Sequence, residues 1–239
     1  MRLVVRTWNV FHGNTEPPGR RTHLEEMVRL VCSDRPGVVC LQEVPVRDLS
    51  RLGTWSGMTP FTAVAAGPRL GSVRLGSVLT RLHAGLFSRW LSGDGNAILV
   101  DRQLDVAGEW VTEISETGER RVCHAVRVAG LGVVANFHAT WRAAADEQFR
   151  RAVLFVESLA QEGEALVLCG DTNVRPAGGG TYDVLREHLY SRPAAGTDQI
   201  LVRGSADTEI SVWPSDRRRA NGRLLSDHAP VELVLEVEG

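Results

Sequence analysis

Apolar and polar residues alternate most clearly near the end of the chain, where the apolar Val231, Leu233, Leu235 and Val237 alternate with Glu232, Glu236 and Glu238. Alternation with a period of two predicts a half-buried β-strand. Short apolar runs bounded by polar or turn residues predict further strands, some of them buried on both faces. The strands expected on these grounds cover residues 3–10, 37–44, 97–100, 121–128, 131–137, 165–169, 199–203, 208–213 and 230–237.

Helical spacing of apolar residues occurs in fewer places. One helix is predicted around Leu24, Met27, Val28 and Val31 and should end before Pro36; a second is predicted from Phe149 to Leu159, and a shorter third over 181–189. Strands therefore outnumber helices, and the helices fall between some of them. This order predicts a layered α/β fold with mixed sheets. No linker-like stretch divides the chain, so we expect a single domain over residues 1–239.

Composition narrows the possible functions only a little. The chain has a net charge of −2, so no global positive field draws it to nucleic acid. All 27 basic residues are arginines. The absence of lysine excludes a lysine nucleophile, a Schiff base and the lysine-containing phosphate loop of nucleotide hydrolases.

Signals of compartment and assembly are those of a cytoplasmic protein. The cysteines (Cys32, Cys40, Cys123 and Cys169) are widely spaced within apolar runs, which predicts core thiols rather than a zinc cluster. The first residues lack the apolar core of a secretory signal. No apolar run approaches the ~18 residues of a membrane span. We expect a cytoplasmic monomer without membrane insertion.

One stretch differs in charge from the rest of the chain. Residues 49–93 contain no acidic residue but several arginines, and the sequence RLGSV occurs twice in tandem, at 69–73 and 74–78. The stretch could face a phosphate group through Arg69 and Arg74, or it could be a solvated insertion. The sequence leaves both interpretations open.

Polar residues with metal or phosphate chemistry stand at the ends of many predicted strands. They are Asn9, Glu43, His138, Asp171, Asn173, Asp198, Asp227 and His228. Each one alone is explained as a turn residue or a strand cap. Together they offer the hard oxygen ligands that Mg²⁺ or Mn²⁺ prefers, and imidazoles for acid–base chemistry or phosphate binding.

The motifs TWNV, LQEV, FHAT, CGDTN and LSDHAPV, in this order, resemble those of the endonuclease/exonuclease/phosphatase superfamily. The resemblance runs from residue 4 to about residue 235. It implies a four-layer α/β/β/α sandwich of two mixed sheets flanked by helices. The GDTN form of the fourth motif is similar to that of the tyrosyl-DNA phosphodiesterase branch, whereas FHAT departs from the usual THL and TDQILV from IDYIF.

The resemblance also implies a role for each residue. Glu43 is expected to be the main ligand of a Mg²⁺ or Mn²⁺ ion, with Asn9 and Asp227 beside it. Asp171 would activate the attacking water, and Asn173 would hold that water or the phosphate. His228, oriented by Asp198, would contact the scissile phosphate, and His138 would be a second phosphate-binding imidazole.

We therefore expect a divalent-metal-dependent phosphodiesterase or nuclease that acts by in-line attack of water. Two alternatives remain: a phosphomonoesterase of a small phosphorylated molecule, and a catalytically silent binding module on the same fold. A silent module would be expected to lack Glu43, Asp171 or His228, all of which are present. The negative charge argues against long nucleic acid as substrate, whereas the basic stretches 49–93 and 217–223 argue for it.

Overall fold

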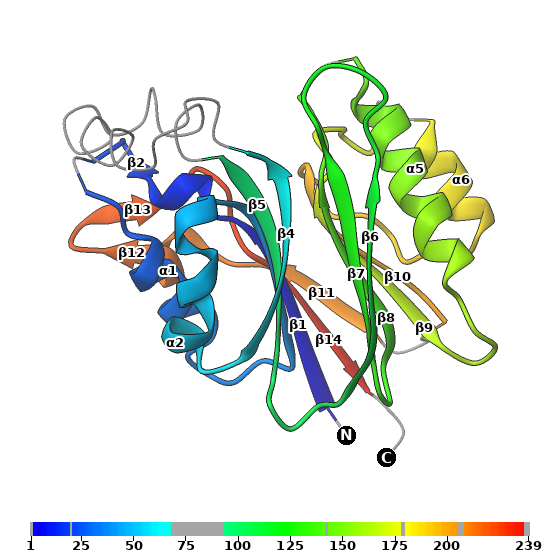
Figure 1. Ribbon diagram of the computed structural model, residues 1–239, viewed down its shortest axis with the longest axis horizontal. Coiled ribbons are helices and arrows are strands. Elements are labelled where there is room, and N and C mark those ends of the chain that lie inside the picture. The colour runs from blue at the N-terminus through cyan, green and yellow to red at the C-terminus, as the bar shows by residue number, and fades with distance from the viewer. Residues whose placement is uncertain are drawn as a thin grey trace.

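The structure is a computed structural model that describes residues 2–19, 21–67, 93–141, 143–177, 180–204 and 208–236. Two β-sheets stack face to face, and helices cover the outer face of each (Figure 1). The four-layer α/β/β/α sandwich predicted from the sequence is thus confirmed. Both sheets are mixed: β1 (Arg2–Asn9) pairs in parallel with β3 (Val38–Val44), and β8 (Gly132–His138) with β9 (Ala165–Asp171), while their other strand pairs are antiparallel.

The six-stranded sheet has the order β11 (Thr208–Val212), β14 (Val231–Glu236), β1 (Arg2–Asn9), β3 (Val38–Val44), β5 (Asp94–Val100) and β4 (Thr59–Ala66). The five-stranded sheet has the order β10 (Asp198–Arg203), β9 (Ala165–Asp171), β8 (Gly132–His138), β7 (Val122–Val128) and β6 (Val106–Glu113). A small sheet joins β12 (Arg219–Ala220), β13 (Arg223–Leu225) and β2 (Thr15–Glu16). The first sheet is covered by α1 (Leu24–Val31) and α2 (Leu52–Ser56), and the second by α5 (Ala145–Ser158) and α6 (Thr181–Glu187).

Strand periodicity explains how the layers share their apolar residues. On β8, Val133 and Phe137 belong to the core under α5, while Val134 belongs to the core between the two sheets. Successive side chains of a strand point to opposite faces, so one strand fills both cores. The strand is buried along its whole length, which is why its sequence is apolar rather than alternating.

A buried polar bridge joins the two sheets close to the end that carries the predicted site. The side-chain amide of Gln42 on β3 donates to Oδ1 of Asn136 on β8 at 2.7 Å and to Oγ1 of Thr7 at 2.8 Å. The amide of Asn136 donates in turn to the backbone carbonyls of Leu41 and Ala97, both at 2.9 Å. Because buried polar groups are costly unless paired, this network favours one fixed register between the sheets.

The sequence did not predict β4 and β6 of the large sheets, the helix α2, or the short strands β2, β12 and β13 of the small sheet. β4 buries only the small residues Ala63 and Ala65 at full depth, and β6 lies at a sheet edge with every second residue exposed. α2 has five residues, too few for helical spacing to be visible. The pairing of β4 with β5 and of β6 with β7 was decided by tertiary contacts rather than by the local sequence pattern.

The four cysteines are unpaired and buried, as predicted. Within the part of the chain that the structure describes, every helix is too short or too polar to cross a membrane.

Candidate active site

Three of the predicted site residues lie side by side because their strands are in register. His138 on β8 pairs with Asp171 on β9, and Asp171 pairs with Asp198 on β10. His138 and Asp171 follow inner-face residues of their strands by two positions, and Asp198 precedes the inner-face residue Ile200 by two. The side chains of all three therefore point into the space between the sheets. The sheet register therefore brings an imidazole and two carboxylates into one row at the end of the five-stranded sheet.

Glu43 reaches the same place by a backbone irregularity. Regular alternation would send it away from the inner face that Gln42 occupies. The pairing of β3 with β5 shifts register between Leu41 and Val44, and Glu43 has a φ of +57°. Its carboxylate lies 3.7 Å from Nε2 of His138 in the opposite sheet. A bulge with a left-handed residue is a strained device that re-aims a side chain, and such strain is typical of functional sites.

Asn9 joins the carboxylates of the two sheets. Its amide nitrogen lies 3.3 Å from Oε1 of Glu43 and 3.2 Å from Oδ2 of Asp171. Its Oδ1 accepts the backbone N–H of Phe11 at 3.0 Å, which fixes the orientation of the amide. In this arrangement Asn9 faces the site with donors, so its role as a metal ligand stays a prediction.

The SDH segment enters the site from the loop before β14. Ser226 has a φ of +60°, and its hydroxyl donates to the backbone carbonyl of Asn9 at 2.7 Å. The backbone N–H of His228 donates to that hydroxyl at 3.1 Å. The indole N–H of Trp8 and the guanidinium of Arg218 both donate to the backbone carbonyl of His228 at 3.0 Å. The loop is therefore held rigidly against β1.

Asp198 orients the imidazole of His228. Nδ1 of His228 lies 2.8 Å from Oδ2 and 3.1 Å from Oδ1 of Asp198. Burial lowers the pKa of His228, but the hydrogen bond and charge of Asp198, together with the charges of Asp171 and Asp227, outweigh burial and raise this pKa to about 9. At neutral pH the ring is a cation held beside the other carboxylates.

Asp171 is the most deeply buried carboxylate of the group, with 1% of its surface exposed. Burial and the charge of Asp198 raise its pKa to about 6, against the opposing effects of His228 and of hydrogen bonds from Asn173 and Asn9. A carboxylate with a pKa near neutrality is suited to accept a proton from water.

The remaining predicted residues lie at the margin of this group or outside the described chain. Asn173, with a φ of +51°, donates its backbone N–H to Asp171 and its side-chain amide to the carbonyl of Ala139 at 2.8 Å. Asp227 is 41% exposed and lies 3.9 Å from Nε2 of His228. Arg69 and Arg74 fall outside the described residues.

Three residues at the site were not singled out from the sequence. Nε2 of His12 lies 3.1 Å from Oε2 of Glu43, Arg218 binds the carbonyls of the SDH loop, and Arg121 contacts His138. His12 and Arg218 lie in segments that look like surface loops, and Arg121 is one of two adjacent arginines in a polar turn. Nothing in their local pattern distinguishes them from solvated residues.

The donor chemistry of the site fits a hard divalent cation. Glu43, Asp171 and Asp227 supply carboxylate oxygens, which Mg²⁺ and Mn²⁺ prefer. Oxygen or nitrogen atoms of Asp171, Asp198 and His228 also lie within 4.8 Å of one another. This trio is a poor cation site at neutral pH, because Nδ1 of the protonated His228 carries a hydrogen directed at Asp198. The carboxylate of Glu43 lies on the other side of Asn9, and its role as a metal ligand stays a prediction.

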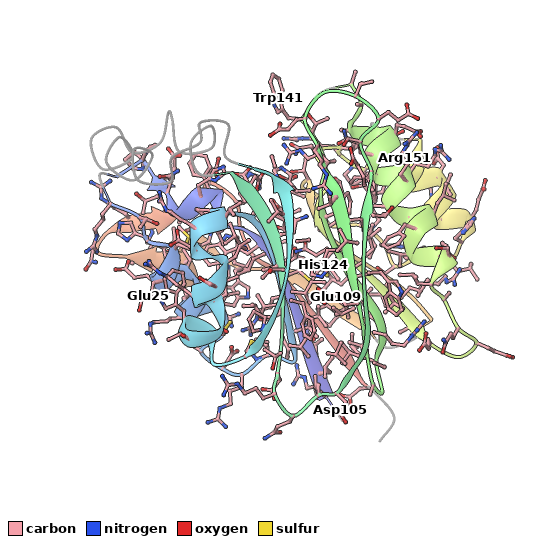
Figure 2. The ribbon with its side chains drawn as sticks, in the orientation of Figure 1. Glu25, Asp105, Glu109, His124, Trp141 and Arg151 are labelled. Carbon is pink, nitrogen blue, oxygen red and sulfur yellow. The ribbon has the colours of Figure 1, made fainter. Side chains whose placement is uncertain are left out.

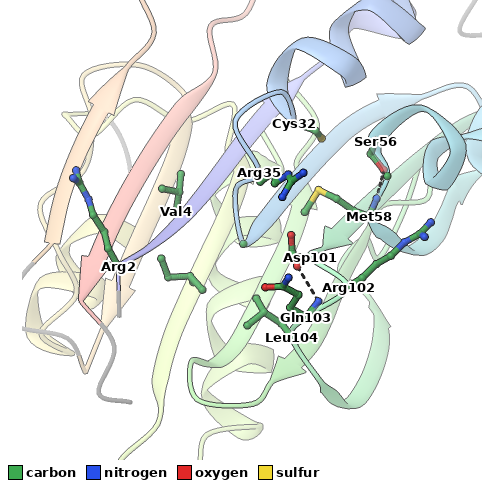
Figure 3. Close-up of a pocket in the computed structure, with 13 residues that line it drawn as sticks. Arg2, Val4, Cys32, Arg35, Ser56, Met58, Asp101, Arg102, Gln103 and Leu104 are labelled. Atoms are coloured by element: carbon green, nitrogen blue, oxygen red, sulfur yellow. Dashed lines mark hydrogen bonds between the residues drawn. The ribbon is translucent and has the colours of Figure 1, made fainter.

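An exposed tryptophan lies near the candidate site, and a separate cavity lies at the other end of the sheet. Trp141 follows His138 by three residues, is 69% exposed and stands at the rim above β8 (Figure 2). A cavity of about 570 Å³ lies at the opposite end of β1, where Arg2, Arg35 and Arg102 are among the residues that line it (Figure 3). None of the candidate site residues lines this cavity.

Comparison with known proteins places the chain in a family. A model of the endonuclease/exonuclease/phosphatase family matches residues 7–228. Among curated protein sequences none matches the chain.

Solved structures share its fold at low sequence identity. An endonuclease/exonuclease/phosphatase protein from Bacteroides vulgatus has a TM-score of 0.70 and 14% identity over 100% of both chains. The mannosyl-6-phosphatase Bt3783 of Bacteroides thetaiotaomicron has a TM-score of 0.68 and 16% identity, over 98% of this chain and 100% of the other. Truncated TDP2 of Caenorhabditis elegans has a TM-score of 0.67 and 16% identity, over 98% of this chain and 97% of the other.

Proposed function

The chain belongs to the endonuclease/exonuclease/phosphatase family, and from this premise we propose that it hydrolyses phosphodiesters with the help of a divalent metal ion. The observation that supports this most directly is the setting of Asp171. It is a buried carboxylate with a pKa of about 6, and it lies 3.8 Å from a histidine that is cationic at neutral pH. A base and a cation side by side are what attack of water on phosphorus requires.

In the proposed reaction Asp171 accepts a proton from the water that attacks phosphorus, while the bond between phosphorus and the leaving oxygen breaks on the opposite side and that oxygen takes up a proton from solvent. His228 places its charged Nε2–H on a non-bridging oxygen, where negative charge increases in the transition state. Asp198 holds the ring of His228 in the required orientation through Nδ1. Asn173 and His138 supply further donors to the water or the phosphate.

Glu43, with Asp227 and with Asn9 beside it, is the proposed holder of the Mg²⁺ or Mn²⁺ ion. When bound, the ion would draw negative charge from the phosphoryl oxygens. The hydrogen bonds from Asn9 to both Glu43 and Asp171 keep the two carboxylates at a fixed spacing before any ligand arrives, which is the preorganisation that such a site needs.

We propose a phosphodiester substrate ahead of a phosphomonoester on the strength of the GDTN motif at residues 170–173. Its Thr172 is buried, and its hydroxyl oxygen lies 2.8 and 2.9 Å from the backbone carbonyls of Val174 and Thr197, one of which accepts its single hydrogen, so the motif has a defined local structure. The likeness to a Bacteroides mannosyl-6-phosphatase favours the phosphomonoesterase as the second candidate. Nucleic acid remains one of the candidate diesters.

A substrate panel with Mg²⁺ and Mn²⁺ tests the proposal. It would compare bis(p-nitrophenyl) phosphate, abasic DNA, single-stranded DNA and RNA and phosphotyrosyl-DNA with p-nitrophenyl phosphate, inositol phosphates and mannose 6-phosphate. We expect turnover of diesters that stops in EDTA and in Asp171→Asn. The matched control is Asp183→Asn, which changes an exposed carboxylate on α6. A preference for monoesters would favour the phosphatase, and failure on every substrate by folded protein would favour a silent binding module.

A further inference from the structure

Arg121 is a buried arginine at the edge of the site, in the loop that leads into β7. Only 1% of its surface is exposed. Its NH1 group lies 3.0 Å from Nδ1 of His138 and 3.3 Å from Oδ2 of Asp94 on β5, and its NH2 group lies 3.3 Å from Oε2 of Glu119. Arg121 therefore spans both sheets, since Asp94 belongs to one and His138 to the other.

The hydrogen bond between Arg121 and His138 can run in one direction only. A guanidinium in a protein has five N–H donors and no acceptor, so Nδ1 of His138 must accept. The ring hydrogen of His138 is then on Nε2. That nitrogen faces the site, 3.7 Å from Oε1 of Glu43 and 3.7 Å from Oδ2 of Asp171.

We propose that Arg121 is a positioning residue, which fixes the ring tautomer of His138 so that its Nε2–H points into the site as a donor to a phosphoryl oxygen. The role assigned to that hydrogen rests on the proposed function, whereas the tautomer itself does not. Asp94 and Glu119 hold the guanidinium in its buried position, so that the donor to Nδ1 is fixed as well.

The two imidazoles of the site are set in opposite ways by their Nδ1 partners. His228 has the carboxylate of Asp198 at Nδ1, so its Nδ1 donates. His138 has the guanidinium of Arg121 there, so its Nδ1 accepts. Both rings then direct an N–H from Nε2 toward the phosphate. The ring of His228 does so as a cation, and the ring of His138 does so as a neutral imidazole. Two cations side by side would repel each other, and the arrangement avoids that cost.

The tautomer can be observed directly in the wild-type protein. Two-bond ¹H–¹⁵N spectra of the uniformly labelled chain, with and without Mg²⁺, distinguish a ring protonated at Nε2 from one protonated at Nδ1. The signals of His138 are assigned by their loss in His138→Gln; the chain has 7 histidines in all. We expect His138 to carry its hydrogen on Nε2. A hydrogen on Nδ1, or an equal mixture of tautomers, would overturn the proposal whatever the enzyme hydrolyses.

Substitution then tests whether Arg121 causes that tautomer. In Arg121→Met we expect a mixture of tautomers and a fall in kcat of at least about tenfold, with KM changed less, as when a group that orients a reacting side chain is lost. Arg121→Lys, which keeps a donor group, should restore part of the Nε2-protonated tautomer and part of kcat. Arg120→Met is the matched control, because Arg120 is the neighbouring arginine but bonds to Glu113 and to the carbonyl of Val64.

The outcomes separate the two proposals. If Arg121→Met keeps the Nε2–H signature and a normal rate, the positioning role is wrong even if the enzyme is a phosphodiesterase. If the tautomer shifts as expected while no phosphate ester is hydrolysed by any variant, the proposed function fails and the tautomer assignment stands. Should Arg121→Met not fold, Arg121→Lys and the wild-type spectrum still decide the question.

Discussion

Replacing Asp198 by asparagine should shift the pH dependence of activity toward acid. Asp198 contacts His228 through two oxygens at 2.8 and 3.1 Å and is the largest contributor that raises the pKa of His228. It also raises the pKa of its cross-strand neighbour Asp171. Asparagine keeps the shape and removes the charge. Both groups should then ionise at lower pH, which moves both limbs of the profile in the same direction.

The size of the effect follows from the pKa of His228. The surroundings raise it from 6.5 to about 9, a difference of about 2.5 pH units, which at ~1.4 kcal/mol per unit favours the cation by on the order of 3 kcal/mol. An opposite charge at contact distance accounts for roughly 1–3 pH units. In wild type, kcat/KM should rise as Asp171 ionises near pH 6 and fall as His228 loses its proton near pH 9. In Asp198→Asn the alkaline limb of the kcat/KM profile should move to lower pH by about one to two units.

The stability of the protein should depend on pH in a related way. The pKa of His228 is raised in the folded state, so its contribution to folding is complete below about pH 6.5 and is lost as the pH rises through about 9. Asp198→Asn should therefore lower the free energy of unfolding at pH 6. At pH 10 it should cost little or even stabilise, because the variant no longer places two anions opposite each other on β9 and β10.

The assay is kcat/KM against pH from 5 to 10 with saturating Mg²⁺, together with urea unfolding at pH 6 and pH 10 in chelator. Asp183→Asn serves as the control for removal of an exposed carboxylate. Superimposable profiles for wild type and Asp198→Asn would refute the reasoning, as would an alkaline limb that moves upward. Either result would return Asp198 to the role of a turn residue at the start of β10.

Three further outcomes follow from the structure. Glu43→Gln should weaken Mg²⁺ or Mn²⁺ binding, measured by calorimetry, and leave thermal unfolding in EDTA nearly unchanged; tight binding by the variant would count against Glu43 as the ligand. Asp171→Asn should lower kcat by about 10²–10⁴-fold without lowering stability at pH 7, because the pKa of Asp171 is raised and its ionised form is the disfavoured one in the fold; a near-normal rate would remove it as the base. Asn136→Leu should cost roughly 1–3 kcal/mol of unfolding free energy by urea titration, because it removes one of the two acceptors of the buried Gln42 amide and the donor to the backbone carbonyls of Leu41 and Ala97; no loss would show that the bridge between the sheets is neutral.

Much of the fold was predictable because strand and helix periods are local properties. The strands through Leu233 on β14 and Val134 on β8 show apolar patterns that any half-buried or buried strand must have. β4 and β6 were missed because one buries alanines and the other lies at an edge, so their pairing depends on neighbouring strands rather than on their own residues.

The sequence by itself determined which residues with metal and phosphate chemistry stand at strand ends, and their motifs identified the family. The tertiary structure decided how they meet. His138, Asp171 and Asp198 form a row only through the register of three strands, and Glu43 joins them only through a bulge and a left-handed backbone.

The direction in which each imidazole donates was also set by tertiary contacts. Arg121 is separated from His138 by 17 positions in the chain, and Asp198 from His228 by 30. No local pattern encodes such pairs: Arg121 meets His138 through the antiparallel register of β7 with β8, whereas Asp198 on β10 meets His228 through the stacking of the two sheets and the loop before β14. A hydrogen bond between distant residues fixes the tautomer and charge of a ring, and only the folded chain brings such partners within 3 Å of each other.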